Sequence, residues 1–317
     1  MSMTSSVLPA PRGGWAAAAA FATFLVIGLI GAYRYVDNYW LYRGFAPPHD
    51  AAFVHEHGSA QQITVTSPAL GGRRQPVDIY LPPGYSAHPF RRYPVLYLLH
   101  GFPGRPGAFL QTVRMGVVQD ELVALHRARP LILVMPFGST GSFTDKEWAN
   151  GVRPHEGWET FVARDLVRAV DARYRAIRSG RSRAIAGLSE GGYAALNIAI
   201  HHPGEFRVVE SWSGYEIADH VASVFGRERD STLMKRNSPQ LTITEATRKL
   251  RRAHTYFWFY SGTDDRALKQ NDRFAHTLAQ LHLPYRYAVV HGGHNWGIWR
   301  GRAVDAYLAA AKRLHGA

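Results

Sequence analysis

The sequence predicts an α/β fold in which a mostly parallel central sheet carries helices on both faces. Short apolar runs, typical of buried parallel strands, alternate along most of the chain with segments whose apolar residues recur at helical spacing. This alternation favours right-handed strand–helix–strand units. A chain of 317 residues, of which 46% are hydrophobic, can bury one large core of this kind.

The predicted elements follow one another regularly after an opening antiparallel hairpin, whose two strands alternate apolar and polar residues. This hairpin is expected at 62–66 and 77–81. Buried strands are expected at 93–99, 130–135, 182–187, 208–213, 255–261 and 285–290, and helices at 116–128, 158–174, 191–200, 268–281 and 297–314. Residues 214–252 interrupt the alternation with a polar, basic stretch. We expect them to form a lid over the cleft, with a pair of surface helices as the alternative.

Residues 187–191 read Gly-Leu-Ser-Glu-Gly and lie between a predicted strand and a predicted helix. A serine hydroxyl is a weak nucleophile unless the backbone exposes it in a tight turn beside a base. Gly187 and Gly191 remove side chains where the strand and the helix would otherwise collide. The five-residue pattern is common by itself. Its strand–turn–helix context predicts that Ser189 is a catalytic nucleophile.

A candidate acid and a candidate base follow Ser189 at the ends of later strands. The turn after one strand presents Asp264 and Asp265, and we favour Asp265 because it lies further round the turn. Asp264 remains the alternative. After the last strand we favour His294 as the base over His291, because two glycines precede His294 and a helical pattern follows it. The order serine, aspartate, histidine is that of α/β-hydrolases.

Backbone N–H groups must also stabilise the oxyanion that forms when a serine attacks an ester. The third predicted strand, 93–99, is followed by His100-Gly-Phe-Pro-Gly104, a glycine-containing turn at the place where this fold positions one oxyanion donor. We therefore predict that the oxyanion hole consists of the N–H groups of Phe102 and Glu190. His100 is expected to shape this turn rather than to transfer a proton.

Three tryptophans adjoin the ends of these motifs and are candidates for lining a substrate pocket: Trp148, Trp212 and Trp296. Ordinary packing is the alternative for each, because aromatic side chains fill cores well. No metal and no other cofactor is expected, because the chain has no Cys and no cluster of His at zinc-binding spacing. The absence of Cys also excludes disulfides and a cysteine nucleophile.

From about residue 60 to the C-terminus the sequence resembles the esterase D / antigen 85 family of α/β-hydrolases. The resemblance implies an α/β-hydrolase fold and ester chemistry on Ser189. Antigen 85 mycolyltransferases use a Glu as the triad acid and contain cysteines, whereas this chain offers Asp and has no Cys. The matching segments are His100–Gly104, Pro136–Phe143, Ser142–Trp148, Trp158–Phe161, Gly187–Gly192, Gly262–Asp265 and Gly292–Trp296.

These observations predict a serine carboxylic-ester hydrolase or acyltransferase that acts through an acyl-enzyme on Ser189. The substrate would be a small-molecule ester or a lipid or cell-wall ester. A non-catalytic binding or cell-wall-associated protein on the same scaffold is the alternative function. The formal net charge of +13 suits an anionic lipid, a cell-wall polymer or an acidic substrate, or it reflects a solvated Arg-rich surface. No nucleic-acid partner is expected, since no recognisable nucleic-acid-binding module accompanies the small basic clusters. The oligomeric state is left unassigned.

Residues 1–45 are expected to form a membrane anchor or signal segment with an aromatic linker, and residues 46–317 the catalytic domain. Residues 15–33 contain no charge over 19 positions, which nearly spans a hydrocarbon core of about 30 Å. An uncleaved anchor is favoured over a cleaved secretory signal or a buried helix. Positive charges tend to stay on the cytoplasmic side, and the segment has one arginine before it and two after it: Arg12, Arg34 and Arg43. This count slightly favours a cytoplasmic catalytic domain. Analogy with exported esterases of the family favours an extracytoplasmic one, which we expect.

Overall fold

The computed structural model describes residues 13–141, 143–229 and 231–316, and the chain divides into two units, Met1–Ala46 and Pro47–Ala317. In the first unit, α1 (Gly13–Tyr42) is a continuous helix of 30 residues. From Gly14 this helix is long and apolar enough to cross a membrane. Its most apolar stretch has a mean hydropathy of 2.0, and none of that stretch is buried inside the structure. A signal sequence would share these properties. Arg12, which bears on the orientation, lies outside the described residues.

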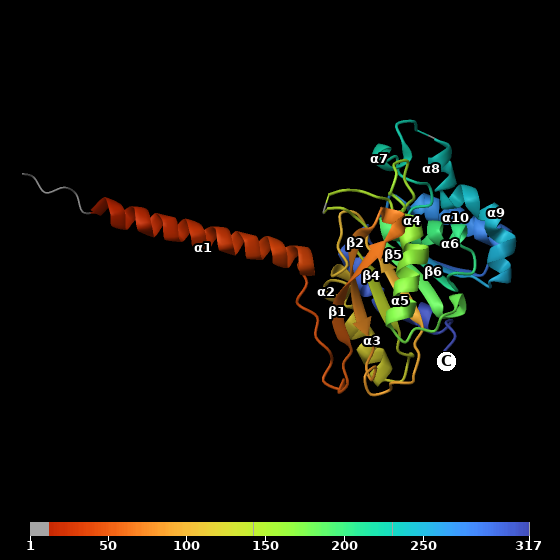
Figure 1. Ribbon diagram of the computed structural model, residues 1–317, viewed down its shortest axis with the longest axis horizontal. Coiled ribbons are helices and arrows are strands. Elements are labelled where there is room, and N and C mark those ends of the chain that lie inside the picture. Colours follow the sequence, from red (N-terminus) through yellow and green to blue (C-terminus); the bar gives the residue numbers. More distant parts are fainter. Residues whose placement is uncertain (1–12, 142, 230, 317) are drawn as a thin grey trace, which may run out of the picture. The chain divides into compact units, whose positions relative to one another are not determined.

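The second unit contains an eight-stranded sheet in the order β1-β2-β4-β3-β5-β6-β7-β8 (Figure 1). The first two strands form the expected antiparallel hairpin, β2 pairs antiparallel with β4, and all later neighbours are parallel. The predicted α/β-hydrolase fold is confirmed. The strands are β1 (Ser59–Ser67), β2 (Arg73–Leu81), β3 (Val95–Leu99), β4 (Ile132–Pro136), β5 (Arg183–Leu188), β6 (Val208–Trp212), β7 (Tyr256–Gly262) and β8 (Tyr285–Val290).

Helices cover both faces of the sheet because successive strand residues point to opposite sides. In β3, Tyr97 faces a core shared with α5 (Val167–Arg173), α6 (Glu190–His201), α9 (Pro239–Arg252) and α10 (Leu268–Gln280). Its neighbour Leu98 faces the opposite core, which is shared with α2 (Ala108–Gln111), α3 (Met115–Ala124), α11 (Trp296–Gly301) and α12 (Ala303–Ala311). All five residues of β3 are buried, as expected for a central parallel strand.

Two of the predicted helices are interrupted in the structure. The helix predicted over 158–174 consists of α4 (Trp158–Thr160), a π-helical stretch over Phe161–Leu166, and α5. The helix predicted over 297–314 is divided into α11 and α12 at Arg302, directly after Gly301. Glycine weakens a helix interior because it loses more backbone entropy than other residues, which accounts for the break at this position.

The segment predicted as a lid contains α7 (Ala222–Phe225), α8 (Thr232–Arg236) and α9. The last of these joins β6 to β7 and buries Ile243 and Leu250 in the core beside α6. Helix α9 is therefore an ordinary crossover helix of the fold. The residues that precede α9 carry the two short helices at the top of Figure 1, and the lid remains a prediction for them.

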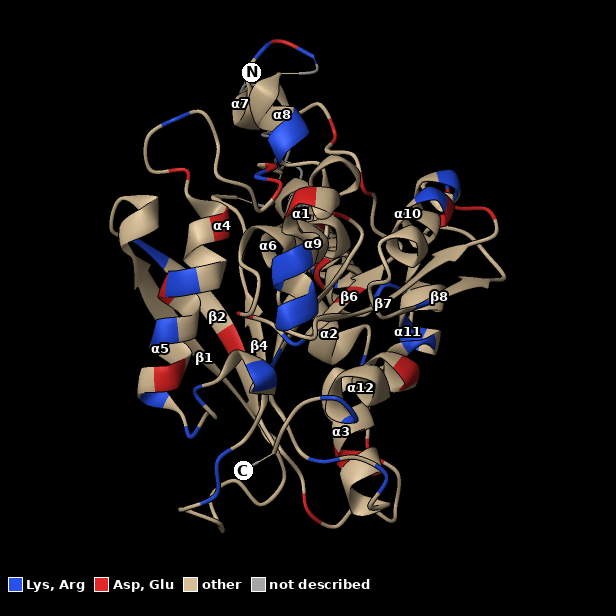
Figure 2. Ribbon diagram, turned by 90° about the vertical axis from the view of Figure 1, so that its right-hand side faces the viewer, with Lys and Arg blue, Asp and Glu red and all other residues tan. Residues whose placement is uncertain are grey.

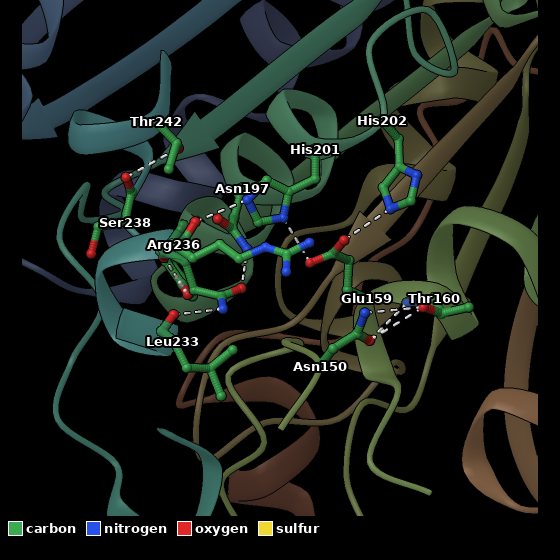
Figure 3. A network of polar contacts seen from close by, with 12 residues as sticks. Asn150, Glu159, Thr160, Asn197, His201, His202, Leu233, Arg236, Ser238 and Thr242 are labelled. Atoms are coloured by element: carbon green, nitrogen blue, oxygen red, sulfur yellow. Dashed lines mark hydrogen bonds and ion pairs between the residues drawn. The ribbon is translucent and has the colours of Figure 1, made fainter. Parts of the chain in front are cut away.

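A partly buried polar network links α8 to α4 and α6 (Figure 3). Glu159 accepts hydrogen bonds from His201 Nδ1 and His202 Nε2, both at 2.9 Å. His201 Nε2 lies 2.9 Å from the carbonyl oxygen of Arg236, at the end of α8. A carboxylate and a carbonyl can only accept, so both ring nitrogens of His201 must donate, and the network requires the imidazolium form.

Replacing Glu159 with glutamine is expected to destabilise the protein most at mildly acidic pH. Burial alone would raise the pKa of Glu159, but the hydrogen bonds from His201 and His202 outweigh it and lower the pKa to about 2. A depressed acid pKa stabilises the fold above the unfolded value of 4.5 and loses this effect as the pH falls toward 2. Burial alone would lower the pKa of His201, but its contacts with Glu159 outweigh burial and leave this pKa raised. The stability that protonated His201 contributes is therefore complete below the unfolded pKa of 6.5 and is lost at higher pH.

The measurement is denaturant unfolding of Glu159→Gln and the wild type at pH 3, 6 and 9. We expect a loss of about 3 kcal/mol at pH 6, from 1.36 kcal/mol for each pKa unit, and a smaller loss at pH 3 and pH 9. Glu245→Gln, at an exposed position of α9, is the matched control. A loss that does not change with pH would contradict the ionic nature of this network.

Candidate active site

Ser189 occupies a sharp turn between β5 and α6, with φ 56° and ψ −124°. Such a conformation is strained for a residue with a side chain, and it presents the hydroxyl at the carboxyl edge of the sheet. Glycines make the turn possible: a Cβ on Gly191 would lie 1.9 Å from the carbonyl oxygen of Leu99, and one on Gly187 would lie 2.2 Å from that of Gly191. The turn is further fixed by the Ser189 N–H, which donates to the carbonyl of Trp212 at 2.9 Å.

The structure brings the predicted nucleophile, base and acid into one chain of hydrogen bonds. His294 Nε2 lies 2.8 Å from Ser189 Oγ, and His294 Nδ1 lies 2.9 Å from Asp265 Oδ2. Asp265 can only accept, so Nδ1 carries the hydrogen and Nε2 is free to accept the serine proton. This is the arrangement by which a histidine can deprotonate a serine while an aspartate holds its tautomer.

Asp265, rather than Asp264, contacts the histidine. The side chain of Asp265 is fully buried, and its Oδ1 accepts a hydrogen bond from the Ala267 N–H at 2.9 Å. Burial would raise the pKa of Asp265, but the hydrogen bonds from His294 and Ala267 outweigh it, and the pKa is lowered. The carboxylate therefore stays ionised beside His294. Asp264 and His291 are both exposed and lie outside this hydrogen-bonded chain.

The two predicted oxyanion donors lie on segments next to Ser189. Glu190 is the first residue of α6, so its N–H has no carbonyl partner inside the helix. Phe102 follows Gly101, where an added Cβ would lie 2.8 Å from the Cβ of Ser189. Only glycine allows the loop before Phe102 to approach the nucleophile this closely. Both N–H groups remain predicted donors.

His100 holds the loop that carries Phe102. Its Nε2 accepts a hydrogen bond from the Gly138 N–H at 3.0 Å, and its Nδ1 donates to the Gly101 carbonyl at 2.9 Å. Burial lowers the pKa of His100 to about 4, so the ring is neutral at physiological pH. These contacts occupy both ring nitrogens, which agrees with the structural role expected for this residue.

The three tryptophans considered for a substrate pocket lie in different environments. Trp148 and Trp212 are 0% and 1% exposed, which leaves them no surface for contacting a substrate. Their indole N–H groups donate to the His100 carbonyl and to Glu210 Oε2, both at 3.0 Å. Both side chains therefore act in packing. Trp296 is partly exposed, and it remains the one of the three available for the pocket.

Trp299 contributes to the site although the sequence analysis did not select it. Its ring packs edge-on against His294 at 5.1 Å between centroids and contacts Trp296 in the same way at 4.9 Å. This contact limits the rotation of the His294 imidazole. The spacing of Trp296 and Trp299 on one helical face, directly after His294, was the signal that could have identified it.

Buried carboxyl groups also lie behind the nucleophile. Burial raises the pKa of Glu190 and of Glu147, and the acidic side chains of Asp145 and Asp219 raise it further. Tyr215 donates a hydrogen bond to Glu147 Oε2 at 2.8 Å. The protonated forms are thus favoured, which limits negative charge next to Ser189.

Positive side chains occur on many elements of the second unit. Figure 2 places Lys and Arg on α5, α8, α9 and α10 and in several loops rather than along a single stripe. This distribution agrees with a solvated Arg-rich surface. The positive charge is not gathered at one recognition face in this view.

Comparisons with known proteins agree with this geometry. A family model described as "Putative esterase" matches residues 67–309. An uncharacterized protein of Corynebacterium glutamicum is 27% identical over 248 residues, which are 74% of this chain and 56% of that protein. Esterase Rv1288 of Mycobacterium tuberculosis is 34% identical over 138 residues, which are 44% of this chain and 28% of that protein. The chain therefore spans little more than half of the first relative and less of the second.

Solved structures share the fold. A ferulic acid esterase superposes with a TM-score of 0.69 at 22% identity, covering 81% of this chain and all of that one. The corresponding values for MPT51 (FbpC1) of Mycobacterium tuberculosis are 0.63 and 18%, covering 81% of this chain and 99% of that one. Identity at this level supports the fold alone.

The topology of the sheet and the strained turn that carries Ser189 define an α/β-hydrolase. The chain belongs to the family described as "Putative esterase", whose model covers most of the second unit. This membership confirms the resemblance inferred from the motifs. A sequence relative named as an esterase agrees with this membership.

Proposed function

We propose that the chain hydrolyses carboxylic esters through an acyl-enzyme on Ser189, with His294 as general base and Asp265 as its orienting acid. The observation that carries this proposal is the continuous hydrogen-bonded chain from Asp265 Oδ2 through His294 to Ser189 Oγ. The three residues come from turns after three different strands, and they meet at the carboxyl edge of the sheet. Packing alone gives no reason for them to meet there.

In the first step His294 Nε2 takes the hydroxyl proton while Ser189 Oγ attacks the ester carbonyl carbon. The N–H groups of Phe102 and Glu190 donate to the oxyanion of the tetrahedral intermediate. The imidazolium of His294 then returns its proton to the leaving alcohol as the C–O bond breaks. Asp265 stabilises the imidazolium throughout, because its carboxylate accepts the Nδ1–H.

Deacylation decides between hydrolysis and acyl transfer. A water molecule that gives its proton to His294 releases the acid, whereas an alcohol that does so forms a new ester. Both outcomes use the same acyl-enzyme. Hydrolysis is the primary proposal, because the family model is described as an esterase and a sequence relative is named as one. The alternative is transfer of the acyl group to a sugar or lipid hydroxyl.

A panel of esters tests this function. We expect the wild type to release p-nitrophenol from p-nitrophenyl acetate. Comparing its turnover of p-nitrophenyl palmitate with that of methyl ferulate then shows whether it prefers a long acyl chain or an aromatic acyl group. Each reaction is run with and without glucose as an acceptor, and the products are identified by mass spectrometry. Free acid as the main product in both conditions supports hydrolysis, and acylated glucose supports transfer. Failure to turn over any of these esters would contradict the proposal.

We also propose that α1 holds the protein at a membrane with the catalytic unit on the extracytoplasmic side. The support is the length of α1 and the exposure of its apolar side chains, including Phe21, Phe24 and Ile27. Membranes from cells producing the full chain should retain it after alkaline carbonate extraction. Protease added outside intact spheroplasts should degrade the catalytic unit. Release by carbonate would indicate a cleaved signal, and protection from the protease would indicate the opposite orientation.

A further inference from the structure

A second cluster of polar side chains lies where the segment before β1 meets α3. Asp50, His57 and Asp120 each offer one ligand atom, and these atoms all lie within 4.8 Å of one another. His57 Nδ1 lies 2.7 Å from Asp50 Oδ2. Transition metals bind imidazole and carboxylate ligands at about 2.0–2.2 Å, which sets their ligand atoms about 3–4 Å apart. The three groups are close enough to meet at one ion, which would replace the hydrogen bond between His57 and Asp50 and hold these two atoms further apart.

Asp120 supplies a separate observation that points to a ligand. The residue is 1% exposed, and among the described residues its Oδ1 has no hydrogen-bond partner. Asp50 Oδ1 is likewise buried without a partner in the described part of the chain. A buried carboxylate oxygen that has lost its water and has no hydrogen-bond donor destabilises the fold. Two negatively charged carboxylates close together also repel each other. A bound cation would remove both costs.

The surroundings of Asp120 also hold it in one orientation. Its Oδ2 accepts hydrogen bonds from the Gly58 N–H at 2.9 Å and from the Tyr80 hydroxyl at 2.6 Å. Ligating carboxylates in metalloproteins are commonly fixed by such outer contacts. The bond from Gly58 also links the segment that carries His57 directly to α3.

This cluster is remote from the ester chemistry. Tyr80 pairs with Leu133 at the beginning of β4, so the cluster lies at the amino edge of the parallel strands. Ser189 follows the carboxyl end of β5, at the opposite edge. An ion at the cluster would thus act on stability rather than on the reacting ester.

We propose that Asp50, His57 and Asp120 bind one divalent transition-metal ion, with Zn²⁺ as the best match, and that this ion fastens the segment before β1 to α3. The imidazole favours a transition metal over Ca²⁺ or Mg²⁺, which prefer oxygen ligands throughout. The sequence analysis expected no metal because it considered local spacing only. Asp120 is far from the other two ligands along the chain.

The test is isothermal titration of Zn²⁺ into the full-length protein in detergent, freed of metals by a chelator and carrying no histidine tag. We expect one ion per chain and a higher unfolding temperature with Zn²⁺. His57→Gln and Asp120→Asn should each weaken binding by about tenfold or more, since even outer contacts matter by 10–100-fold. His55→Gln, two residues away and exposed, should bind as the wild type does.

Cobalt gives an independent readout, because Co²⁺ bound through nitrogen and oxygen ligands absorbs visible light. The wild type and His55→Gln should give the same spectrum, and His57→Gln should lose it. Hydrolysis of p-nitrophenyl acetate should be unchanged by the chelator, which separates this proposal from the one for Ser189. The proposal is overturned if the wild type binds no Zn²⁺, if it prefers Ca²⁺ or Mg²⁺, or if either variant binds with unchanged affinity. His57 is exposed, so its substitution should not prevent folding.

Discussion

Replacing Ser189 with alanine is expected to abolish ester hydrolysis and covalent labelling by a fluorophosphonate probe. The variant lacks the oxygen that forms the acyl-enzyme, and His294 then has no serine proton to accept. Loss of the nucleophile in comparable hydrolases lowers kcat by roughly 10⁶-fold, and binding with oxyanion stabilisation accounts for what remains. The measurements are p-nitrophenyl acetate turnover and in-gel fluorescence after labelling. The wild type should be labelled on Ser189, as mass spectrometry of the labelled peptide would establish.

Ser86→Ala is the matched control, because Ser86 is exposed in a loop. This variant should retain wild-type turnover and labelling. Equal turnover by Ser189→Ala and the wild type would remove the catalytic assignment. It would then favour the alternative of a non-catalytic binding or cell-wall-associated protein on the same scaffold.

Replacing Asp265 with asparagine is expected to have the second largest effect, a loss of about 10⁴-fold in kcat. An asparagine at this position can donate its amide to His294 Nδ1, which would place the ring hydrogen on Nε2. The histidine would then present the wrong tautomer to Ser189 Oγ, now 2.8 Å from Nε2. The variant should still fold, since asparagine has nearly the same shape and its side-chain oxygen can keep the hydrogen bond to the Ala267 N–H.

Asp264→Asn is the comparison that decides between the neighbouring carboxylates. Asp264 is exposed, and the imidazole is hydrogen-bonded to Asp265 instead, so turnover should stay within about twofold of the wild type, as for most surface substitutions. Both variants are assayed for kcat and KM on the same ester, with circular dichroism to establish folding. A larger loss for Asp264→Asn than for Asp265→Asn would show that the acid is assigned to the wrong residue.

Local sequence patterns predicted much of the fold and the order in which the candidate site residues follow one another along the chain. The alternation of apolar runs with helical patterns predicted the parallel sheet, because strand and helix periodicities depend on neighbouring residues. The turn at Ser189 could be predicted in the same way, because Gly187 and Gly191 occupy positions where only glycine fits. His294 was favoured over His291 on the same kind of local argument, and His294 is the residue that contacts Ser189.

Residue type could not separate packing from binding. Trp148 and Trp212 adjoin the motifs in sequence, yet the folded chain buries both completely. Trp299, to which the sequence analysis gave no role, packs against the imidazole of His294. An aromatic side chain suits a core and a pocket equally well, and only the positions of the surrounding elements decide which one it fills.

By itself, the sequence determined that this chain forms an α/β-hydrolase sheet with a serine at a strand–helix turn and with acid and base candidates after later strands. Only the tertiary structure decided that Asp265 rather than Asp264 meets His294, and that Asp50, His57 and Asp120 form a cluster. The reason is physical. Periodicity and turn chemistry act over a few residues, whereas a contact between distant side chains depends on how the strands pair and how each turn directs its side chains.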